Sequence, residues 1–258
     1  MKRSSILFAI VILSMALAAC GGQSAQSQVT GEETKTYKIA TDATWPPFEY
    51  VDESTKDIIG FDMDLMNAIA EKENLSIEYI NVNWDPLLTG VSECQYDAAI
   101  SAMTITDERK KTMLFSDPYI NAGQIVVVRT DTTDIKSKDD LTGKTVGAQI
   151  GTTGAIEVQN MEGVTLRTYD TVDLAYLDLA NGQIDAVVAD YPTANAFVAK
   201  DADKIMSVGD VFTDEYYGVA ICQKNADLQA KINEGLAAVK EEGLIEKLDA
   251  KWLKGESQ

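Results

Sequence analysis

Residues 144–189 read KTVGAQIGTTGAIEVQNMEGVTLRTYDTVDLAYLDLANGQIDAVVA, and this stretch decides the fold class. Short apolar runs alternate in it with helical patterns, which predicts strands over 144–149, 164–169 and 184–189 and helices over 154–160 and 171–181. Strands that alternate with helices in this way are typical of α/β units with mostly parallel sheets.

The same alternation continues on both sides of this stretch. Upstream, the pattern predicts strands over 37–41, 75–82 and 98–103 and helices over 61–72 and 86–93, with Asp62 as the N-cap of the first helix. Downstream, a helix is expected over 190–200, and two helices broken at Gly243 over 226–254.

Two further β runs lie between these rounds, at 124–129 and 217–223. We expect them to be antiparallel crossover strands that form a hinge between two lobes. The expected lobe boundaries are 36–122 with 217–258 for the first lobe and 123–216 for the second. A cleft between two lobes is a common place for a small ligand.

The N-terminus has the pattern of an export signal. Lys2 and Arg3 precede an apolar run over 6–17, which is too short to remain as a membrane span. The run ends in small residues before Cys20, and this ending resembles the lipobox of bacterial lipoproteins. We therefore expect a signal peptide over 1–19, lipidation of Cys20 and a flexible tether over 20–35. An ordinary signal peptide with an incidental cysteine is the alternative.

Composition excludes several classes of function. The net charge is -19, and removal of residues 1–19 with Lys2 and Arg3 would give -19 - 2 = -21. Such a negative chain is not expected to bind nucleic acid, which needs Lys and Arg. The sequence contains no His, so Ser-His-Asp and Cys-His catalysis are excluded, and we expect no metal and no cofactor. For Cys94 and Cys222 we favour two separate free thiols over a disulfide.

Eight short motifs point to one family. In chain order they are Thr41–Phe48 (TDATWPPF), Gly60–Leu65 (GFDMDL), Tyr96–Ile100 (YDAAI), Thr104–Arg109 (TITDER), Phe115–Tyr119 (FSDPY), Leu141–Lys144 (LTGK), Gly151–Thr153 (GTT) and Ala180–Ala186 (ANGQIDA). Together they resemble the bacterial extracellular solute-binding proteins, family 3. The resemblance spans Tyr37 to Trp252 and implies a two-lobed periplasmic-binding-protein fold of type II with a two-strand hinge.

The resemblance also implies partners for the carboxylate of an α-amino acid. On sequence alone, Arg109 reads as a surface residue of the charged run 108–111, whereas the family motif makes it the bidentate partner of the ligand carboxylate. Thr152 and Thr153 precede a predicted helix, whose first N–H groups favour anions. A plain turn with an N-cap threonine is the alternative there.

Asp190 ends a predicted buried strand, where open α/β sheets place ligand groups. The resemblance gives it the ligand ammonium, and the alternative is a helix N-cap. Ser101, Ala102 and Thr104 follow the strand over 98–103 and match family positions that offer main-chain groups and a hydroxyl. Ala102 stands where the family frequently has Ser or Gly, so one hydroxyl contact is in doubt.

The remaining candidates surround the ligand side chain. Trp45 and Trp84 match positions of apolar or aromatic walls, although each would read as a core residue without the motif. Asp42 matches a position that faces the ligand side chain, and its carboxylate suits an amide, ammonium or guanidinium. Gln149 is a second candidate for that contact. Phe48 reads as a core residue.

The resemblance implies a function in transport. We expect extracellular binding of a polar or basic L-amino acid and delivery to the permease of an ABC transporter, by a monomer anchored through lipid to the outer face of the cell membrane. We do not expect an enzyme. The alternatives are a cyclohexadienyl-dehydratase-like enzyme on the same fold, which would need a positioned general acid, and a sensor module.

Overall fold

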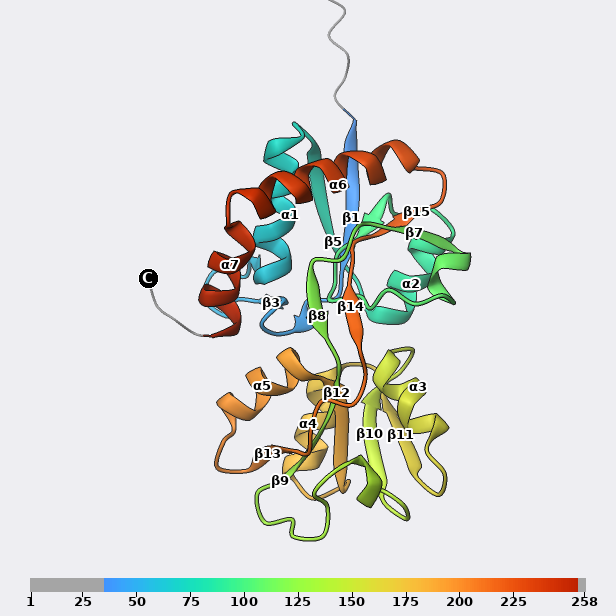
Figure 1. Cartoon of the computed structure of the whole chain (residues 1–258), viewed down its shortest axis with the longest axis vertical. Coiled ribbons are helices and arrows are strands. Elements are labelled where there is room, and N and C mark those ends of the chain that lie inside the picture. Colours follow the sequence, from blue (N-terminus) through green and yellow to red (C-terminus); the bar gives the residue numbers. More distant parts are fainter. Residues whose placement is uncertain (1–34, 255–258) are drawn as a thin grey trace, which may run out of the picture. The chain divides into compact units, whose positions relative to one another are not determined.

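The computed structural model describes residues 35–254, all of which belong to one compact unit. The predicted signal peptide, Cys20 and most of the predicted tether lie outside the described residues. The unit is a mixed α/β fold with two lobes, each built on a five-stranded sheet (Figure 1). The predicted α/β two-lobed fold class is therefore confirmed.

The first sheet has the strand order β5–β1–β6–β15–β7. Its strands are, in that order, Ser76–Asn81, Thr36–Thr41, Ala98–Ala99, Ala220–Cys222 and Met113–Phe115. The pairs β1–β5 and β1–β6 are parallel, whereas β15 is antiparallel to both of its neighbours. The C-terminal strand β15 thus completes a sheet that the N-terminal half of the chain begins.

The second sheet has the strand order β11–β10–β12–β9–β13. These strands are Thr165–Tyr169, Thr145–Gln149, Ala186–Asp190, Gln124–Arg129 and Ile205–Val208. Parallel pairing joins β10 to β11 and β12, as the alternating pattern predicts, and β9 is antiparallel to β12 and β13. A small three-stranded sheet contains β2, β3 and β4, at Thr44–Trp45, Glu49–Val51 and Ile58–Ile59.

Helices pack against these sheets. The α-helices α1 to α7 span Phe61–Lys72, Trp84–Ser92, Thr153–Asn160, Val172–Ala180, Tyr191–Lys200, Ala226–Glu241 and Leu244–Leu248. Short 3₁₀ turns are η1 and η2, at Arg109–Lys111 and Lys138–Asp140, and the π-helical turn η3 is Asp249–Leu253. Among the described residues, no helix is long and apolar enough to cross a membrane.

The crossover strands differ from the predicted ones. The run 124–129 is β9 inside the second sheet, and β15 at the end of the run 217–223 lies inside the first. The strands that pass between the lobes are β8 (Ile120–Ala122) and β14 (Glu215–Tyr217), which pair antiparallel (Figure 1). The predicted assignment was wrong because both crossover strands are three residues long and adjoin longer apolar runs.

Two further local predictions were wrong. Asp62 is not the N-cap of α1, because that position is Gly60; the Asp62 side chain is instead buried and accepts hydrogen bonds from Ala102 N–H and Tyr119 O–H, at 2.7 and 2.9 Å. The strand predicted over 98–103 pairs only through its first two residues. The chain leaves strand geometry there, with Ala102 in the left-handed region at φ 42°. Phe48 is fully buried, as predicted.

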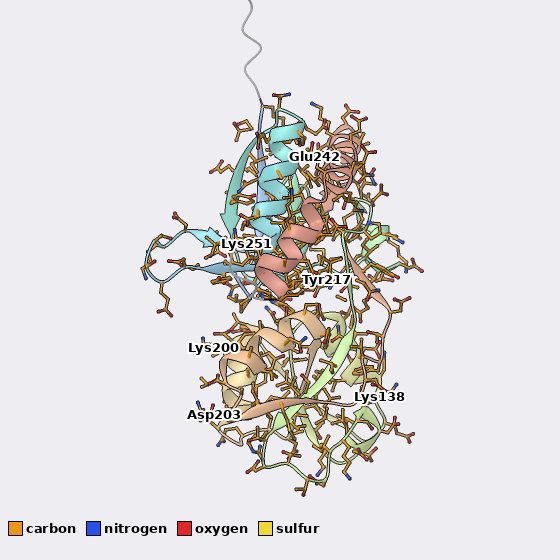
Figure 2. The ribbon with its side chains drawn as sticks, turned by 60° about the vertical axis from the view of Figure 1, so that its left-hand side comes forward. Lys138, Lys200, Asp203, Tyr217, Glu242 and Lys251 are labelled. Atoms are coloured by element: carbon orange, nitrogen blue, oxygen red, sulfur yellow. A yellow bond between two sulfur atoms is a disulfide. The ribbon has the colours of Figure 1, made fainter. Side chains whose placement is uncertain are left out.

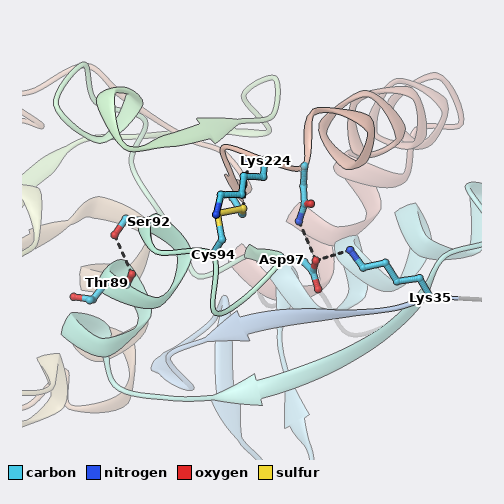
Figure 3. The surroundings of a disulfide bond; sticks show 8 residues. Lys35, Thr89, Ser92, Cys94, Asp97 and Lys224 are labelled. Atoms are coloured by element: carbon cyan, nitrogen blue, oxygen red, sulfur yellow. Dashed lines mark hydrogen bonds and ion pairs between the residues drawn. A yellow bond between two sulfur atoms is a disulfide. The ribbon is translucent and has the colours of Figure 1, made fainter.

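Cys94 and Cys222 form a disulfide, so the preference for two free thiols was wrong (Figure 3). Their Cα atoms are 5.0 Å apart although 128 residues separate them in sequence. The pairing of β15 with β6 brings Cys222 N–H within 3.0 Å of Asp97 O, close to the loop that carries Cys94. This proximity depends on long-range strand pairing, which cysteine spacing does not reveal.

Candidate functional site

One small pocket collects most of the predicted site residues. About 210 Å³ of atom-free space is lined by Trp45, Trp84, Ser101, Ala102, Thr104, Arg109, Thr152, Thr153 and Asp190. The first six belong to β2, the start of α2, the segment after β6 and the start of η1. The last three stand at the N-terminus of α3 and the end of β12. The pocket therefore lies between chain segments associated with the two sheets.

Arg109 reaches across this pocket. Its guanidinium donates to Thr104 O at 2.7 Å and to Gly151 O at 3.2 Å, and it stacks over the Trp84 ring with 5.2 Å to the centroid. Burial lowers the pKa of Arg109 to about 10, and Asp190 and Glu215 oppose that shift. The side chain stays cationic at neutral pH and can pair with a carboxylate.

Asp190 supplies a carboxyl group from the other side of the pocket. It accepts hydrogen bonds from Tyr217 O–H at 2.5 Å and from the Gln124 amide. Burial and, less strongly, the neighbouring Glu215 raise the pKa of Asp190, against the lowering effect of hydrogen bonds from Tyr217 and Gln124, and the result is a pKa of about 6. Asp190 occupies the N-cap position of α5, but its side chain makes no capping hydrogen bond. Each of its oxygens accepts one hydrogen bond from the protein and keeps a second lone pair for a cationic group.

The two threonines before α3 have different roles in the structure. Thr152 caps the helix, because its hydroxyl accepts from Ala155 N–H at 3.2 Å and donates to Gln149 O at 2.8 Å. The hydroxyl of Thr153 donates instead to Glu215 at 2.7 Å. The N-terminus of α3 thus faces the pocket with both threonine hydroxyls already bonded within the protein.

Ser101 and Ala102 form the floor of the pocket, and their polar groups bond to residues behind it. The hydroxyl of Ser101 accepts from Asp42 N–H and donates to Glu49, both at 3.0 Å. The N–H of Ala102 donates to Asp62. Two buried carboxyl groups, on Glu49 and Asp62, therefore hold this floor in place.

Asp42 and Gln149 do not line the pocket but lie beside its Trp45 wall. The amide N–H of Gln149 donates to Asp42 and to Asp170 O, both at 2.9 Å, and its carbonyl accepts from Trp45 Nε1 at 2.5 Å. Burial raises the pKa of Asp42. The rings of Trp45 and Trp84 are 6.5 Å apart between centroids. These contacts join β1 and β2 directly to the end of β10.

Three residues at the site were missed by sequence analysis: Glu215, Tyr217 and Gln124. All three are buried, and each bonds a predicted site residue. An acidic residue directly before two tyrosines is the signal in the sequence that could have identified Glu215. Among residues 35–254, no group of three or more Cys, Asp or Glu side chains could hold a metal ion.

Comparison with known proteins shows the family of this chain. Residues 37–255 match the family described as bacterial extracellular solute-binding proteins, family 3. This chain belongs to that family. The resemblance stated from the motifs is therefore confirmed.

Relatives within this family are named as binding proteins. A probable histidine-binding protein of Neisseria gonorrhoeae is 34% identical over 96% of this chain and 94% of that protein. A putative ABC transporter arginine-binding protein 2 of Escherichia coli (strain K12) is 35% identical over 84% of this chain and 90% of its own length.

Solved structures share the fold. An ancestral arginine-binding protein bound to arginine is 38% identical, with a TM-score of 0.80 over 84% of this chain and 97% of that one. The arginine-, lysine-, histidine-binding protein ArtJ of Geobacillus stearothermophilus is 36% identical, with a TM-score of 0.81 over 87% and 97%. The family-3 chain described here therefore has the fold of these amino-acid-binding proteins.

Proposed function

We propose that this family-3 protein binds a polar or basic L-amino acid between its lobes and delivers it to the permease of an ABC transporter. The observation that carries the proposal is the placement of Arg109 and Asp190 in one pocket. An α-amino acid is a zwitterion, so its carboxylate would pair with Arg109 and its ammonium with Asp190. Trp45 and Trp84 would enclose the aliphatic part of the side chain.

The charges around the pocket favour a cationic side chain. Asp42, Asp190 and Glu215 are at least nine-tenths buried in or beside the pocket, and Asp190 and Glu215 act electrostatically on Arg109. A zwitterion adds no net charge, whereas arginine or lysine adds one positive charge beside three carboxyl groups. The names of the relatives, which mention arginine, histidine and lysine, agree with this preference.

A ligand panel tests the proposal. We would measure thermal shifts and then calorimetry with arginine, lysine, histidine and glutamine, since a ligand that binds only the folded state raises its stability. Agmatine, which lacks the carboxylate, and N-acetylarginine, which lacks the free ammonium, should bind far more weakly than arginine. Arg109→Ala should abolish the shift, and Lys110→Ala, at the exposed neighbouring position, is the matched control. If no amino acid binds the wild-type protein, the proposal fails.

The setting of the protein is also a proposal. The N-terminal pattern supports export and anchoring through lipid on Cys20. We propose lobe boundaries at 36–122 plus 217–258 and at 123–216.

We propose a monomer, because two lobes that must hinge seldom need a partner subunit. We also propose that it binds its ligand without reaction, because the named relatives are binding proteins. Metabolic labelling with a fatty acid analogue, with Cys20→Ala as control, tests the anchor, and light scattering tests the monomer.

A further inference from the structure

Glu215 of β14 contacts chain segments from both lobes. One carboxylate oxygen, Oε2, accepts from Thr104 Oγ1 at 2.9 Å and from Thr153 Oγ1 at 2.7 Å. The other, Oε1, accepts from Thr213 Oγ1 at 2.7 Å. Glu215 as a residue is 9% exposed. All of these contacts are with hydroxyl groups.

The two threonines belong to different lobes. Thr104 follows β6 of the first sheet, and its segment pairs directly with β14 through a bridge to Tyr217. Thr153 is the first residue of α3, which packs on β10 and β12 of the second sheet. Tyr217 lies where β14 enters the first lobe (Figure 2). A single carboxylate oxygen of Glu215, on a crossover strand, therefore accepts a hydrogen bond from one hydroxyl of each lobe.

These contacts also close the pocket on the side of the crossover strands. Thr104 and Thr153 line the small pocket with Arg109 and Asp190. The same two residues line an outer groove, of which Glu215 and Thr213 form another part. The two hydroxyls and the carboxylate consequently separate the pocket from this groove.

Hydrogen-bond chemistry fixes the direction of both hydroxyls. A carboxylate accepts and does not donate, so each threonine uses its single O–H toward Glu215. The oxygen of Thr153 also accepts from the Gln124 amide at 3.2 Å. Thr104 then offers the pocket an acceptor, which suits an ammonium N–H and not a carboxylate.

We infer that Glu215 is a positioning residue that holds the two lobes together over a bound ligand and orients the Thr104 hydroxyl as an acceptor for the ligand ammonium. The inference rests on the proposed function. It assigns Glu215 no direct contact with the ligand, and it places the effect of Glu215 mainly on ligand release. Truncation of a buried hydrogen-bonded charge raises the dissociation rate more than it changes association.

The test compares Glu215→Ala and Glu215→Gln with wild type, using arginine as the probe in stopped-flow fluorescence. Loss of two charge-assisted hydrogen bonds should raise the dissociation rate about tenfold to a hundredfold in the alanine variant. Glutamine keeps an acceptor oxygen, so it should restore a large part of the loss. Asp214→Asn removes the neighbouring exposed carboxylate and is the matched control.

A double-mutant cycle isolates the contacts with the threonines. In a Thr104→Val, Thr153→Val background, Glu215→Ala should change the dissociation rate less than threefold, because its partners in the two lobes are already gone and only Thr213 of its own segment remains. If the effect persists in that background, the inference is wrong. A lower melting temperature with an unchanged dissociation rate would likewise overturn it, since that pattern indicates a structural role alone.

A distance measurement separates this inference from the proposed function. Glu53 and Lys200 are exposed and line one surface groove, with Glu53 just after β3 in the chain. Lys200 lies at the end of α5 (Figure 2). Spin labels at Glu53→Cys and Lys200→Cys should show a short distance that Glu215→Ala depopulates. If arginine fails to bind wild type, the proposed function fails, while the label distances still test the contact between lobes. If wild type binds and the distances do not change, Glu215 does not hold the lobes.

Discussion

The buried acid pair behind the pocket floor makes the stability of the protein depend on pH. Glu49 and Asp62 have no exposed surface, and each carboxyl group influences the pKa of the other. Glu49 Oε2 and Asp62 Oδ1 meet no N–H or O–H donor in the described part of the chain. Burial holds the pKa of Glu49 well above its usual value and raises that of Asp62 to about 7. The pair therefore carries at least one proton in the folded protein at neutral pH.

Glu49→Gln replaces the proton of this pair by a permanent amide N–H. In wild type, the folded state keeps a proton on Glu49 that the unfolded chain releases above pH ~4.5. The unfolded state then binds fewer protons, so the free energy of unfolding falls as pH rises, by about 1.4 kcal/mol per pH unit for each such proton. The variant lacks this proton. As pH rises above 5, the stability of the variant should therefore fall less steeply than that of wild type, by up to about 1.4 kcal/mol per pH unit.

Urea unfolding at half-unit pH steps measures this difference. Glu53→Gln changes an exposed carboxylate just after β3, the strand that contains Glu49, and serves as the control, and its curve should run parallel to that of wild type. Parallel curves for Glu49→Gln and wild type would refute a proton held by the pair. A variant that loses stability equally at every pH would show that the amide merely packs badly.

Three shorter predictions concern the site and the disulfide. Arg109→Lys keeps the charge but loses the planar fork, so arginine affinity should fall about a hundredfold by calorimetry; an unchanged affinity would exclude bidentate pairing. Because burial raises the pKa of Asp190 to about 6, the carboxylate becomes protonated below that pH. Affinity for an ammonium should then fall about tenfold per unit below pH 6, and Asp190→Asn should remove this dependence. The disulfide Cys94–Cys222 closes a loop across 128 residues. Its reduction should lower the free energy of unfolding by about 2–5 kcal/mol in denaturant titrations; coincident unfolding curves with and without reductant would contradict this.

Sequence analysis predicted the local elements well where the chain has a strong period. The helix at Phe61–Lys72 has the predicted bounds, and the strand over 144–149 differs by one residue. Both segments bury one face or lie inside a sheet, so their apolar pattern reports on local structure directly. The predicted pocket residues also lie together, because family motifs encode spatial positions that periodicity does not.

The failures involve contacts between distant parts of the chain. The crossover strands β8 and β14 are short, and their pairing joins residues almost a hundred positions apart. Cys94 and Cys222 meet through the pairing of β15. Asp62 reads as a cap from its position at a helix start, yet its true partners lie some forty and sixty residues away. A one-dimensional pattern contains no signal for such partners.

The acidic composition has a second meaning once the fold is known. If every carboxylate were in water, a net charge of -19 would bear only on solubility. Five acids are buried near the pocket, namely Asp42, Glu49, Asp62, Asp190 and Glu215. Hydroxyls and amides, together with a proton kept by one pair, satisfy most of their oxygens, and the cation Arg109 acts on Asp190 and Glu215. Because those neutral donors leave the negative charge of Asp42, Asp190 and Glu215 in place, a cationic amino acid gains more from entering this pocket than a neutral one does. Selectivity for positive charge would then arise from the sum of these carboxylates. Replacing Asp42, which has no proposed contact with the ligand ammonium, should reduce the preference for arginine over glutamine more than it reduces glutamine binding itself.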